Sequence, residues 1–537
     1  MLIKIDRFQG AVEAITPRQL QDNFATKAIN CVVETGALEP VRAPLFVRSL
    51  PHNAKSIFRY SGDHWFSWTT EGVDVVRTPV PYDMTDRVVF TGTGHPKQTR
   101  NDVALGAPVL PANSYRLGVP EGDIVTANPI GMNDPEGFPQ TTYYTMSYVT
   151  GWGEEGPPGR ASNPVTITEG QQVDLILPNP PAGNYNWNGG LKRIYRSSAG
   201  TQAGAFQFVA EVPLATTTFS DFTPQDQLGE VAPSILWDGP PDDNLSRYAT
   251  GQMIGVQVMA SGALVGFSGN TLVYSEAYLP HAWPYSYPVP DKIVSLAVTS
   301  SGVLVATEGK PYIAIGTSPS AVVVQEIDEY AACVSRLSMV DMGEYAIYAS
   351  NDGLIGLDNG NVTILTKELF TREQWQRFNP SSIRAYRWER SYLAFYTNGA
   401  VQKGFIFTPG EGMKEFTELD YHADAGFYDS KEDVLYLAKG NQLLAMDKGQ
   451  PLQYTWRSKE FQLPRPTSFS AIEVHADSYP ITVGLIRDGV RTDYIVSSAS
   501  PQRVSPVRAG VLQFEINSDK TVYSLAVAQS IVELANA

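Results

Sequence analysis

The stretch YSEAYLPHAWPYSYPVP, residues 274–290, places Glu276 and His281 in one short segment. A carboxylate and an imidazole can act as general acid and base when each has a partner within hydrogen-bond reach. However, no nucleophile elbow with Ser or Cys lies nearby, and the chain has no GxSxG motif. Closely spaced prolines also stiffen the segment. We therefore interpret it as a rigid aromatic corner and expect neither Glu276 nor His281 to be catalytic.

A second pair of acids, Glu154 and Glu155, lies in GWGEEGPPG. Paired carboxylates are typical of glycoside hydrolases, in which the two groups flank the scissile bond. Adjacent residues on a loop do not face each other across a substrate. We predict an exposed turn here, without a catalytic role.

The remaining polar motifs are weaker. NDG (351–353) and DNGN (358–361) could bind calcium or belong to a sialidase-like repeat, but they lack the spaced oxygen ligands of an EF-hand and are the expected residues of hairpin turns. TGTGHPKQT (91–99) lacks the Walker spacing. No HExxH or HxH pair occurs among the six histidines, which are His52, His64, His95, His281, His422 and His475. We predict no catalytic, cofactor-binding or metal-binding residue, and no cofactor.

The elements that would carry these motifs are short strands. Between residues 255 and 450 one pattern, apolar strand, polar turn, apolar strand, recurs at intervals of roughly 40–50 residues, the spacing of propeller blades. Its five occurrences are residues 262–276, 293–316, 344–366, 383–407 and 425–447. A lone sheet of this kind cannot bury both faces, whereas radially stacked blades cover one another. We predict a β-propeller of about six blades, closed by hairpins from residues 56–90; the alternative is a meandering β-sandwich.

Two further β-domains are expected beside the propeller. Roughly seven short strands in residues 138–235 predict a sandwich like fibronectin type III, with Tyr144, Met146 and Tyr148 facing its core. Residues 453–537 predict a C-terminal β-sandwich. The predicted organisation is a docking segment (1–55) with a short helix starting at Thr16, closing strands and a connection (56–137), the first sandwich (138–235), the blades (236–452) and the C-terminal domain (453–537).

Composition narrows the function classes. The 537 residues carry 40 basic and 56 acidic side chains, a net charge of −16, and no run of Lys or Arg. This balance disfavours tight phosphate binding as the main task. Two cysteines, Cys31 and Cys333, suggest neither a disulfide framework nor a zinc site. With no apolar signal core at the start and no stretch of 18 uninterrupted apolar residues, we expect synthesis in the cytoplasm and no membrane span.

Several ordered stretches together resemble the tail nozzle proteins of short-tailed bacteriophages, which are akin to tail tubular protein B. They are TPRQLQDNFATKAINCVVETGALEP, VDVVRTPVPYDMTDRVVFTGTGHPKQT, YVTGWGEEGPPGRAS, LKRIYRSS, LVYSEAYLPHAWP, EYAACVSRLSMV, YASNDGLIGL and FTREQWQRFNPSSI. The resemblance implies a propeller with appended β-domains, assembled as a sixfold ring in the virion tail. It also implies that the ring extends the DNA conduit below the head-to-tail connector. This chain is shorter than many nozzle proteins, so insertions for fibre attachment are in question.

Two functions remain open at this point. The first is a structural virion protein, not an enzyme, whose homohexameric ring binds the connector or adaptor protein, with tail fibres or spikes as further candidate partners. Six copies would carry 6 × −16 = −96 charges, and an acidic lumen would let viral DNA pass without specific binding. The alternative is a propeller glycosidase or carbohydrate-binding tail protein that acts on host surface glycan. That alternative requires a cluster of acids and arginines around the propeller axis.

Overall fold

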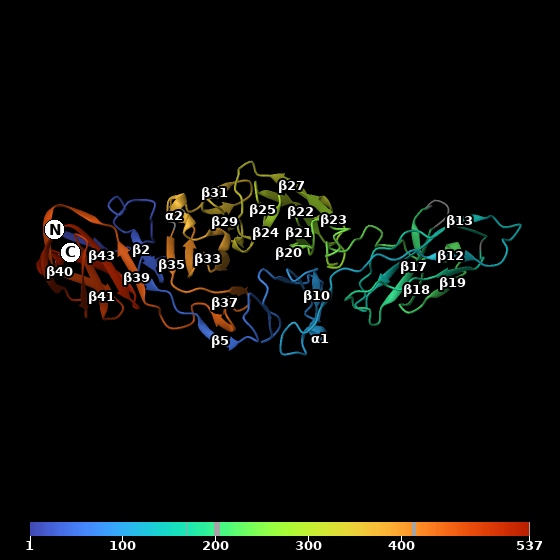
Figure 1. The fold of residues 1–537 in the computed structure, drawn as a ribbon, viewed down its shortest axis with the longest axis horizontal. Coiled ribbons are helices and arrows are strands. Elements are labelled where there is room, and N and C mark those ends of the chain that lie inside the picture. Colours follow the sequence, from blue (N-terminus) through green and yellow to red (C-terminus); the bar gives the residue numbers. More distant parts are fainter. Residues whose placement is uncertain (169, 198–203, 411–414, 536–537) are drawn as a thin grey trace. The chain divides into compact units, whose positions relative to one another are not determined.

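The computed structural model describes residues 1–168, 170–197, 204–410 and 415–535, and strands dominate it (Figure 1). The α-helices within these ranges are short: α1 (Asn101–Ala104), α2 (Arg372–Gln376) and α3 (Ile531–Ala535). Single-turn 3-10 helices occupy Gln225–Gln227, Pro319–Ala321, Arg336–Ser338 and Pro380–Ser382. Helix α2 begins with a capping box, in which Thr371 and Gln374 satisfy each other's backbone N–H groups. The predicted helix at Thr16 is wrong: residues 17–19 form only a turn, closed by the N–H of Gln19 on the carbonyl of Thr16.

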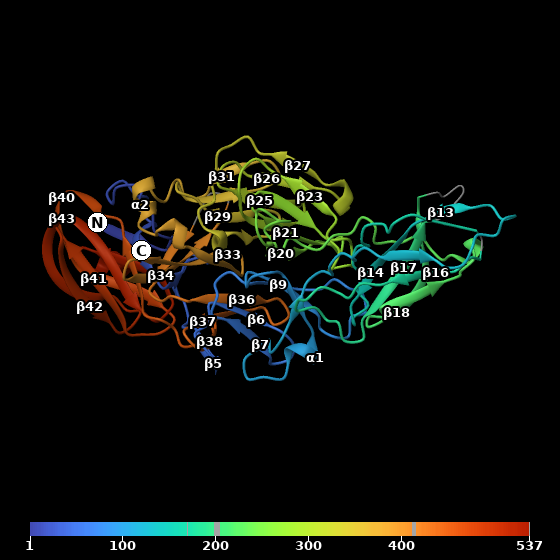
Figure 2. The ribbon, with the colours of Figure 1, turned by 45° about the vertical axis from the view of Figure 1, so that its right-hand side comes forward.

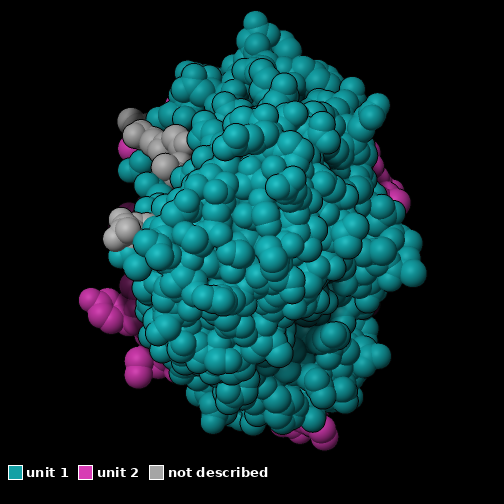
Figure 3. All heavy atoms as spheres, turned by 90° about the vertical axis from the view of Figure 1, so that its left-hand side faces the viewer, with its two compact units in different colours: residues 1–72, 294–314, 325–537 teal, residues 73–293, 315–324 magenta. Residues whose placement is uncertain are grey.

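The chain divides into two compact units, drawn in different colours in Figure 3. Unit 1 comprises residues 1–72, 294–314 and 325–537, and unit 2 comprises residues 73–293 and 315–324. Each unit is described below by itself.

The fold is an all-β propeller with appended β-domains. Its blades are six four-stranded arrangements, with a further hairpin of β6 (Ser56–Arg59) and β7 (Trp65–Trp68). The blades are β8 (Asp74–Arg77), β9 (Val88–Thr91), β10 (Lys97–Thr99) and β11 (Tyr115–Arg116); β20 (Ile254–Val258), β21 (Leu264–Ser268), β22 (Thr271–Tyr274) and β23 (Tyr285–Pro288); β24 (Ile293–Thr299), β25 (Gly302–Thr307), β26 (Tyr312–Ile315) and β27 (Val323–Glu326); β28 (Val340–Asp341), β29 (Ala346–Ala349), β30 (Leu354–Leu357) and β31 (Val362–Ile364); β32 (Arg384–Trp388), β33 (Ser391–Asn398), β34 (Val401–Thr408) and β35 (Glu415–Leu419); and β36 (Ala425–Asp429), β37 (Val434–Lys439) and β38 (Gln442–Ala445) with β5 (Leu45–Ser49).

Successive blades bury their faces against each other, as the sequence pattern predicts. In unit 2, Val89 and Leu117 of the first blade share a core with Leu264 and Val273 of the next. In unit 1, equivalent shared cores join β28–β31 to β32–β35, β32–β35 to β36–β38, and β36–β38 to β6–β7. This burial of apolar faces between sheets is what allows short, two-sided apolar strands to fold.

The predicted hairpin turns are present. Between β29 and β30, the N–H of Ser350 donates to the carbonyl of Gly353 over 2.9 Å. Gly353 has φ +151°, and a Cβ there would lie 2.4 Å from the Oγ1 of Thr366, so only glycine fits. Between β30 and β31, the N–H of Asp358 donates to the carbonyl of Asn361 over 3.1 Å. NDG and DNGN are therefore turns between blade strands.

The strand that completes the last blade differs from our prediction. We expected closure by hairpins from residues 56–90, but β5 pairs with β38, whereas β6 and β7 pair with each other and β8 and β9 begin a blade with β10. Strand β5 was not predicted because its sequence, LFVRS, lacks apolar–polar alternation, and all five of its residues are exposed. The hairpins from residues 56–90 still belong to the propeller: β6–β7 shares a core with β36–β38, and β8–β9 forms a blade with β10 and β11. Residues 100–137, which we expected to form a long connection, also hold more structure than predicted, since α1 and β11 lie within residues 101–116.

The sandwich in unit 2 comprises β12 (Thr126–Pro129), β13 (Gln140–Thr142), β14 (Tyr144–Val149), β15 (Val165–Ile167), β16 (Val173–Ile176), β17 (Leu191–Ser197), β18 (Phe206–Pro213) and β19 (Thr218–Asp221). Its sheets are β12-β16-β19, β14-β17-β18 and the pair β13-β15. Tyr144, Met146 and Tyr148 are fully buried in its core, which confirms the prediction for these three residues. Strand β12 pairs with β16, so the sandwich includes residues before 138.

The C-terminal domain lies in unit 1 and contains long curved strands (Figure 2). It consists of β39 (Tyr454–Ser458), β40 (Phe461–Ala476), β41 (Ile481–Arg487), β42 (Val490–Val496), β43 (Gln502–Ser518) and β44 (Val522–Ala528). The N-terminal segment joins this domain: β1 (Leu2–Ile5) pairs with β44, and β2 (Ala25–Ile29) pairs with β39. A two-stranded sheet of β3 (Cys31–Val32) and β4 (Glu39–Pro40) follows β2.

Both cysteines, Cys31 and Cys333, are buried and free. Burial raises the pKa of each thiol to about 12, so neither is a ready nucleophile. Within the described ranges, the helices are all too short or too polar to cross a lipid bilayer.

Candidate functional site

The turn after β14 carries both members of the Glu154–Glu155 pair into the protein interior. The N–H of Gly153 donates to the carbonyl of Thr150, and the N–H of Thr150 donates back to the carbonyl of Glu154, both over 2.9 Å. Gly153 adopts φ +76°, which favours glycine. Glu154 is 3% exposed and Glu155 is 4% exposed. The predicted exposed turn is therefore wrong.

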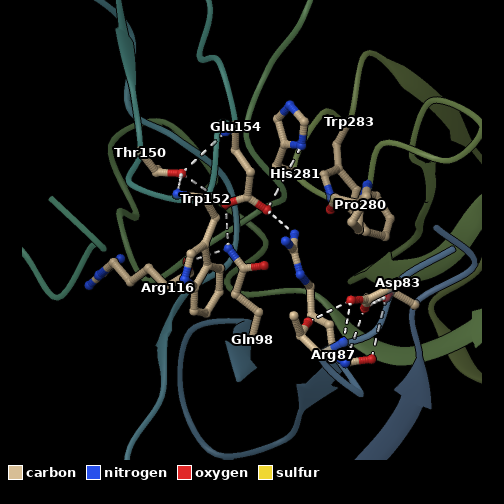
Figure 4. A network of polar contacts seen from close by, with 12 residues as sticks. Asp83, Arg87, Gln98, Arg116, Thr150, Trp152, Glu154, Pro280, His281 and Trp283 are labelled. Carbon is tan, nitrogen blue, oxygen red and sulfur yellow. Dashed lines mark hydrogen bonds and ion pairs between the residues drawn. The ribbon is translucent and has the colours of Figure 1, made fainter. Parts of the chain in front are cut away.

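Glu154 is held by side chains from the neighbouring blade (Figure 4). Arg87, just before β9, donates from Nη1 to Oε1 over 2.8 Å, and Gln98 on β10 donates from Nε2 to Oε2 over 2.8 Å. The guanidinium of Arg87 also lies over the ring of Trp152, 5.0 Å from its centroid. Charge-assisted hydrogen bonds between buried partners are the strong ones, so this cluster fixes the sandwich turn to the blade within unit 2.

His281 belongs to the same cluster. Its Nδ1 lies 4.0 Å from Oε1 of Glu154, and its ring packs edge-on against Trp237 at 5.6 Å between centroids. Burial lowers the pKa of His281, and the nearby carboxylate of Glu154 only partly offsets this. The imidazole is therefore neutral at neutral pH. Its Nε2 is buried and has no hydrogen-bond partner among the described residues.

Glu155 points into a different network. It accepts hydrogen bonds from Arg193 over 2.7 Å, from Tyr195 and Ser147 over 2.6 Å each, and from Ser234 over 3.1 Å. Burial and the hydrogen bond to this carboxylate raise the pKa of Tyr195, so its hydroxyl stays a donor. These donors fill the lone-pair directions of the carboxylate.

The two carboxylates therefore do not form a hydrolytic pair. Each is buried, charge-neutralised by its own arginine and filled with donors, and neither is free to transfer a proton to a ligand. The described residues also contain no group of three or more His, Cys, Asp or Glu side chains that could hold a metal ion. The arrangement stabilises the position of the sandwich turn and supports no reaction at these two carboxylates.

The aromatic corner is built as the sequence suggests. The N–H of Glu276 donates to the carbonyl of Ala282 over 2.8 Å, and its carboxylate accepts from the hydroxyl of Tyr285 over 2.8 Å. Trp283 donates from Nε1 to the carbonyl of Pro280 over 2.8 Å. His281 is the exception, since it also reaches the distant residue Glu154. That proximity could not be predicted, because 127 − 1 = 126 residues separate the two positions along the chain.

The other candidate motifs make local contacts. In residues 91–99, the Nζ of Lys97 donates to the carbonyl of Thr93 over 2.9 Å, so this lysine stabilises its own turn. One further buried ion pair in the sandwich, Arg196 with Asp221 at 2.7 Å, was not predicted from the sequence. Strands β17 and β19 bring these two residues together from distant positions.

Unit 2 also contains a cavity of about 140 Å³. Arg247, Asp238 and Tyr248 line it, and the arginine forms an ion pair with Asp238 at 2.5 Å. A cavity of this volume can hold a few water molecules. The guanidinium of Arg247, which lines it, is already paired with Asp238.

Comparisons with known proteins add little. No protein-family model matches this sequence, and no curated protein matches it significantly. The chain is similar in structure to the N-terminal domain of Nup159 (10% identity, 60% of this chain and 86% of that chain, TM-score 0.26) and to YCF48 from Cyanidioschyzon merolae (9% identity, 83% and 98%, TM-score 0.24). It is also similar to BBS1N from a complex with ARL6DN (13% identity, 51% and 86%, TM-score 0.27). Likeness at this level carries no functional argument.

Proposed function

We propose that this protein is a structural component of a virion tail: a nozzle subunit of a short-tailed bacteriophage, assembled as a homohexameric ring below the connector. The observation that carries the proposal is that the residues most suggestive of catalysis are buried in structural contacts. Glu154, Glu155 and His281 serve as buried structural contacts rather than as an accessible reactive group. The ordered sequence resemblance described above supplies the particular role.

The charge balance supports passive DNA passage through the ring. A genome that moves through a channel must not be held, and each phosphate contact adds salt-sensitive affinity. A net charge of −16 per chain repels phosphate at long range. The ring would contact the connector or adaptor protein, and tail fibres or spikes are further proposed neighbours.

The glycosidase alternative has less support. It needs two carboxylates that face a common substrate, and the one adjacent pair singled out from the sequence, Glu154 and Glu155, is buried in two separate networks. No observation on the described residues favours it over the structural role.

Electron microscopy of the purified protein, and antibody labelling of the virions that encode it, test the proposal. We expect rings with a central channel and labelling at the tail. Exclusively monomeric particles together with unlabelled tails would contradict it. A fluorescence anisotropy titration with duplex DNA provides a second test, because submicromolar affinity at physiological salt would overturn passive passage.

A further inference from the structure

The outer strand of the closing blade, β5, combines features that edge strands normally avoid. It pairs with β38 on one side, and no described strand pairs with its other edge (Figure 2). Its apolar residues Leu45, Phe46 and Val47 are 50%, 52% and 44% exposed, so neither face of the strand is covered. Natural sheets protect exposed edges with lysines, prolines or short length, because a bare apolar edge recruits another strand.

The chemistry of this edge specifies a strand as its occupant. Unpaired backbone N–H and C=O groups along an edge are matched by the backbone of an added strand, and the side chains then give specificity. Arg48 adds a positive charge: its guanidinium donates to the carbonyl of Asp63, and it forms no ion pair with any described carboxylate. The complementary strand should therefore carry apolar and acidic residues.

The chain itself contains such a segment, residues 323–330. It begins with β27, which pairs only with β26 among the described strands, and its Val323 is 56% exposed. The segment contains three acids, and Lys310 bridges two of them, Glu326 and Asp328, at 2.7 and 2.6 Å. The lysine leaves a local charge of +1 − 3 = −2, with Glu329 and the 74% exposed Tyr330 at the surface.

We infer that the open edge of β5 binds residues 323–330 of a second copy of this chain, so that a strand-to-strand contact joins neighbouring subunits. Because two different surfaces meet, the contact is heterologous, and repetition of such a contact generates a ring when the rotation closes. This inference rests on the proposed ring and adds the surfaces that would build it. Charge complementarity between Arg48 and the acidic segment would fix the register and orientation.

A charge swap tests the contact in the purified full-length protein, with assembly followed by analytical ultracentrifugation. Arg48→Glu should weaken assembly about tenfold or more, because it places like charges against each other. Glu329→Lys should do the same, and the double variant should recover assembly. Failure of the double variant to recover assembly would overturn the pairing of these two segments.

An apolar variant and its control provide the second arm. Phe46→Lys should abolish assembly, whereas Val490→Lys should leave it unchanged. Val490 is a matched control because it is 69% exposed on β42, which also pairs on one side only among the described strands. Rings that persist in Phe46→Lys would contradict this inference and leave the proposed function standing. A wild-type chain that never forms rings would contradict the proposed function itself.

Cross-linking identifies the occupant directly. The native cysteines are buried, so Ser49→Cys and Gln325→Cys introduce the reactive thiols at exposed positions of β5 and β27. A mixture of the two single variants should give an inter-chain adduct with a short bismaleimide. Adducts from Ser49→Cys alone would indicate β5-to-β5 pairing about a twofold axis and would overturn the inference.

Discussion

The Glu154–Glu155 turn and strand β5 reverse the usual relation between residue type and burial. Two adjacent glutamates lie in the interior, at 3% and 4% exposure, whereas three adjacent apolar residues of β5 are about half exposed. Polar groups are buried only when partners satisfy them, and exposed apolar groups gain most when something covers them. The turn has its partners within unit 2, whereas β5 has an open edge. The first region therefore stabilises the chain, and the second is suited to an interaction outside it.

The largest expected effect comes from Glu155→Ala. It leaves Arg193, Tyr195 and Ser147 without their shared buried acceptor, and loss of one partner from a buried pair costs about 3–5 kcal/mol. We expect the free energy of unfolding to fall by that amount, measured by denaturant titration. Glu211→Gln is the control, because Glu211 is the more exposed partner of the same arginine, and it should cost less than about 1 kcal/mol. Equal losses in the two variants would contradict the distinction between buried and exposed partners.

Glu154→Gln should have an intermediate effect. The amide keeps the shape of the side chain but lacks the negative charge of Glu154 that pairs with Arg87. The side chain of Arg87 is 13% exposed. A hydrogen bond to a charged group contributes about 1.5–3 kcal/mol, and we expect a loss of unfolding free energy in that range. Asp102→Asn, in a more exposed pair with Arg100, is the control and should lie near zero. An unchanged stability in Glu154→Gln would mean that this pair does not lock the turn.

His281 should make the free energy of unfolding decrease at acidic pH. Its pKa in the folded protein lies below its usual value because of burial, with Arg87 adding to the decrease and Glu154 and Glu155 opposing it. Unfolding therefore takes up a proton below the unfolded pKa of about 6.5. The contribution of the neutral imidazole is fully present above that pH and is lost as the pH falls through the folded pKa.

We expect His281→Asn to flatten this part of the profile of unfolding free energy against pH. His475→Asn, at an exposed position beside Glu473, is the control and should follow the wild-type profile. Parallel curves for wild type and His281→Asn below pH 6.5 would show that the ring does not gain a proton on unfolding.

The two regions also show which features could be predicted from the sequence and which could not. Blade strands, the turns at 351–353 and 358–361, and the buried face of Tyr144, Met146 and Tyr148 follow from local periodicity and turn chemistry, so they could be predicted. The burial of Glu154 could not be predicted, because its partners Arg87 and Gln98 come from a propeller blade, whereas Glu154 lies in the sandwich, and no local sequence pattern indicates their contact. The closing role of β5 was missed for a related reason: a strand exposed on both faces has no alternation to detect.

The smallest expected effect on the folded chain is that of Phe46→Lys. Strand β5 is held by its backbone pairing to β38, and this pairing does not require the aromatic ring. Phe46 is already 52% exposed, and surface substitutions of this kind usually change stability by less than about 0.5 kcal/mol. A lysine on an edge strand also resists unwanted pairing. We therefore expect dilute, dissociated Phe46→Lys to unfold at the wild-type denaturant midpoint while its assembly is lost. A loss of more than about 2 kcal/mol in the dissociated chain, well beyond that surface range, would place Phe46 among the residues that stabilise the fold and would remove the contrast between β5 and the buried glutamates.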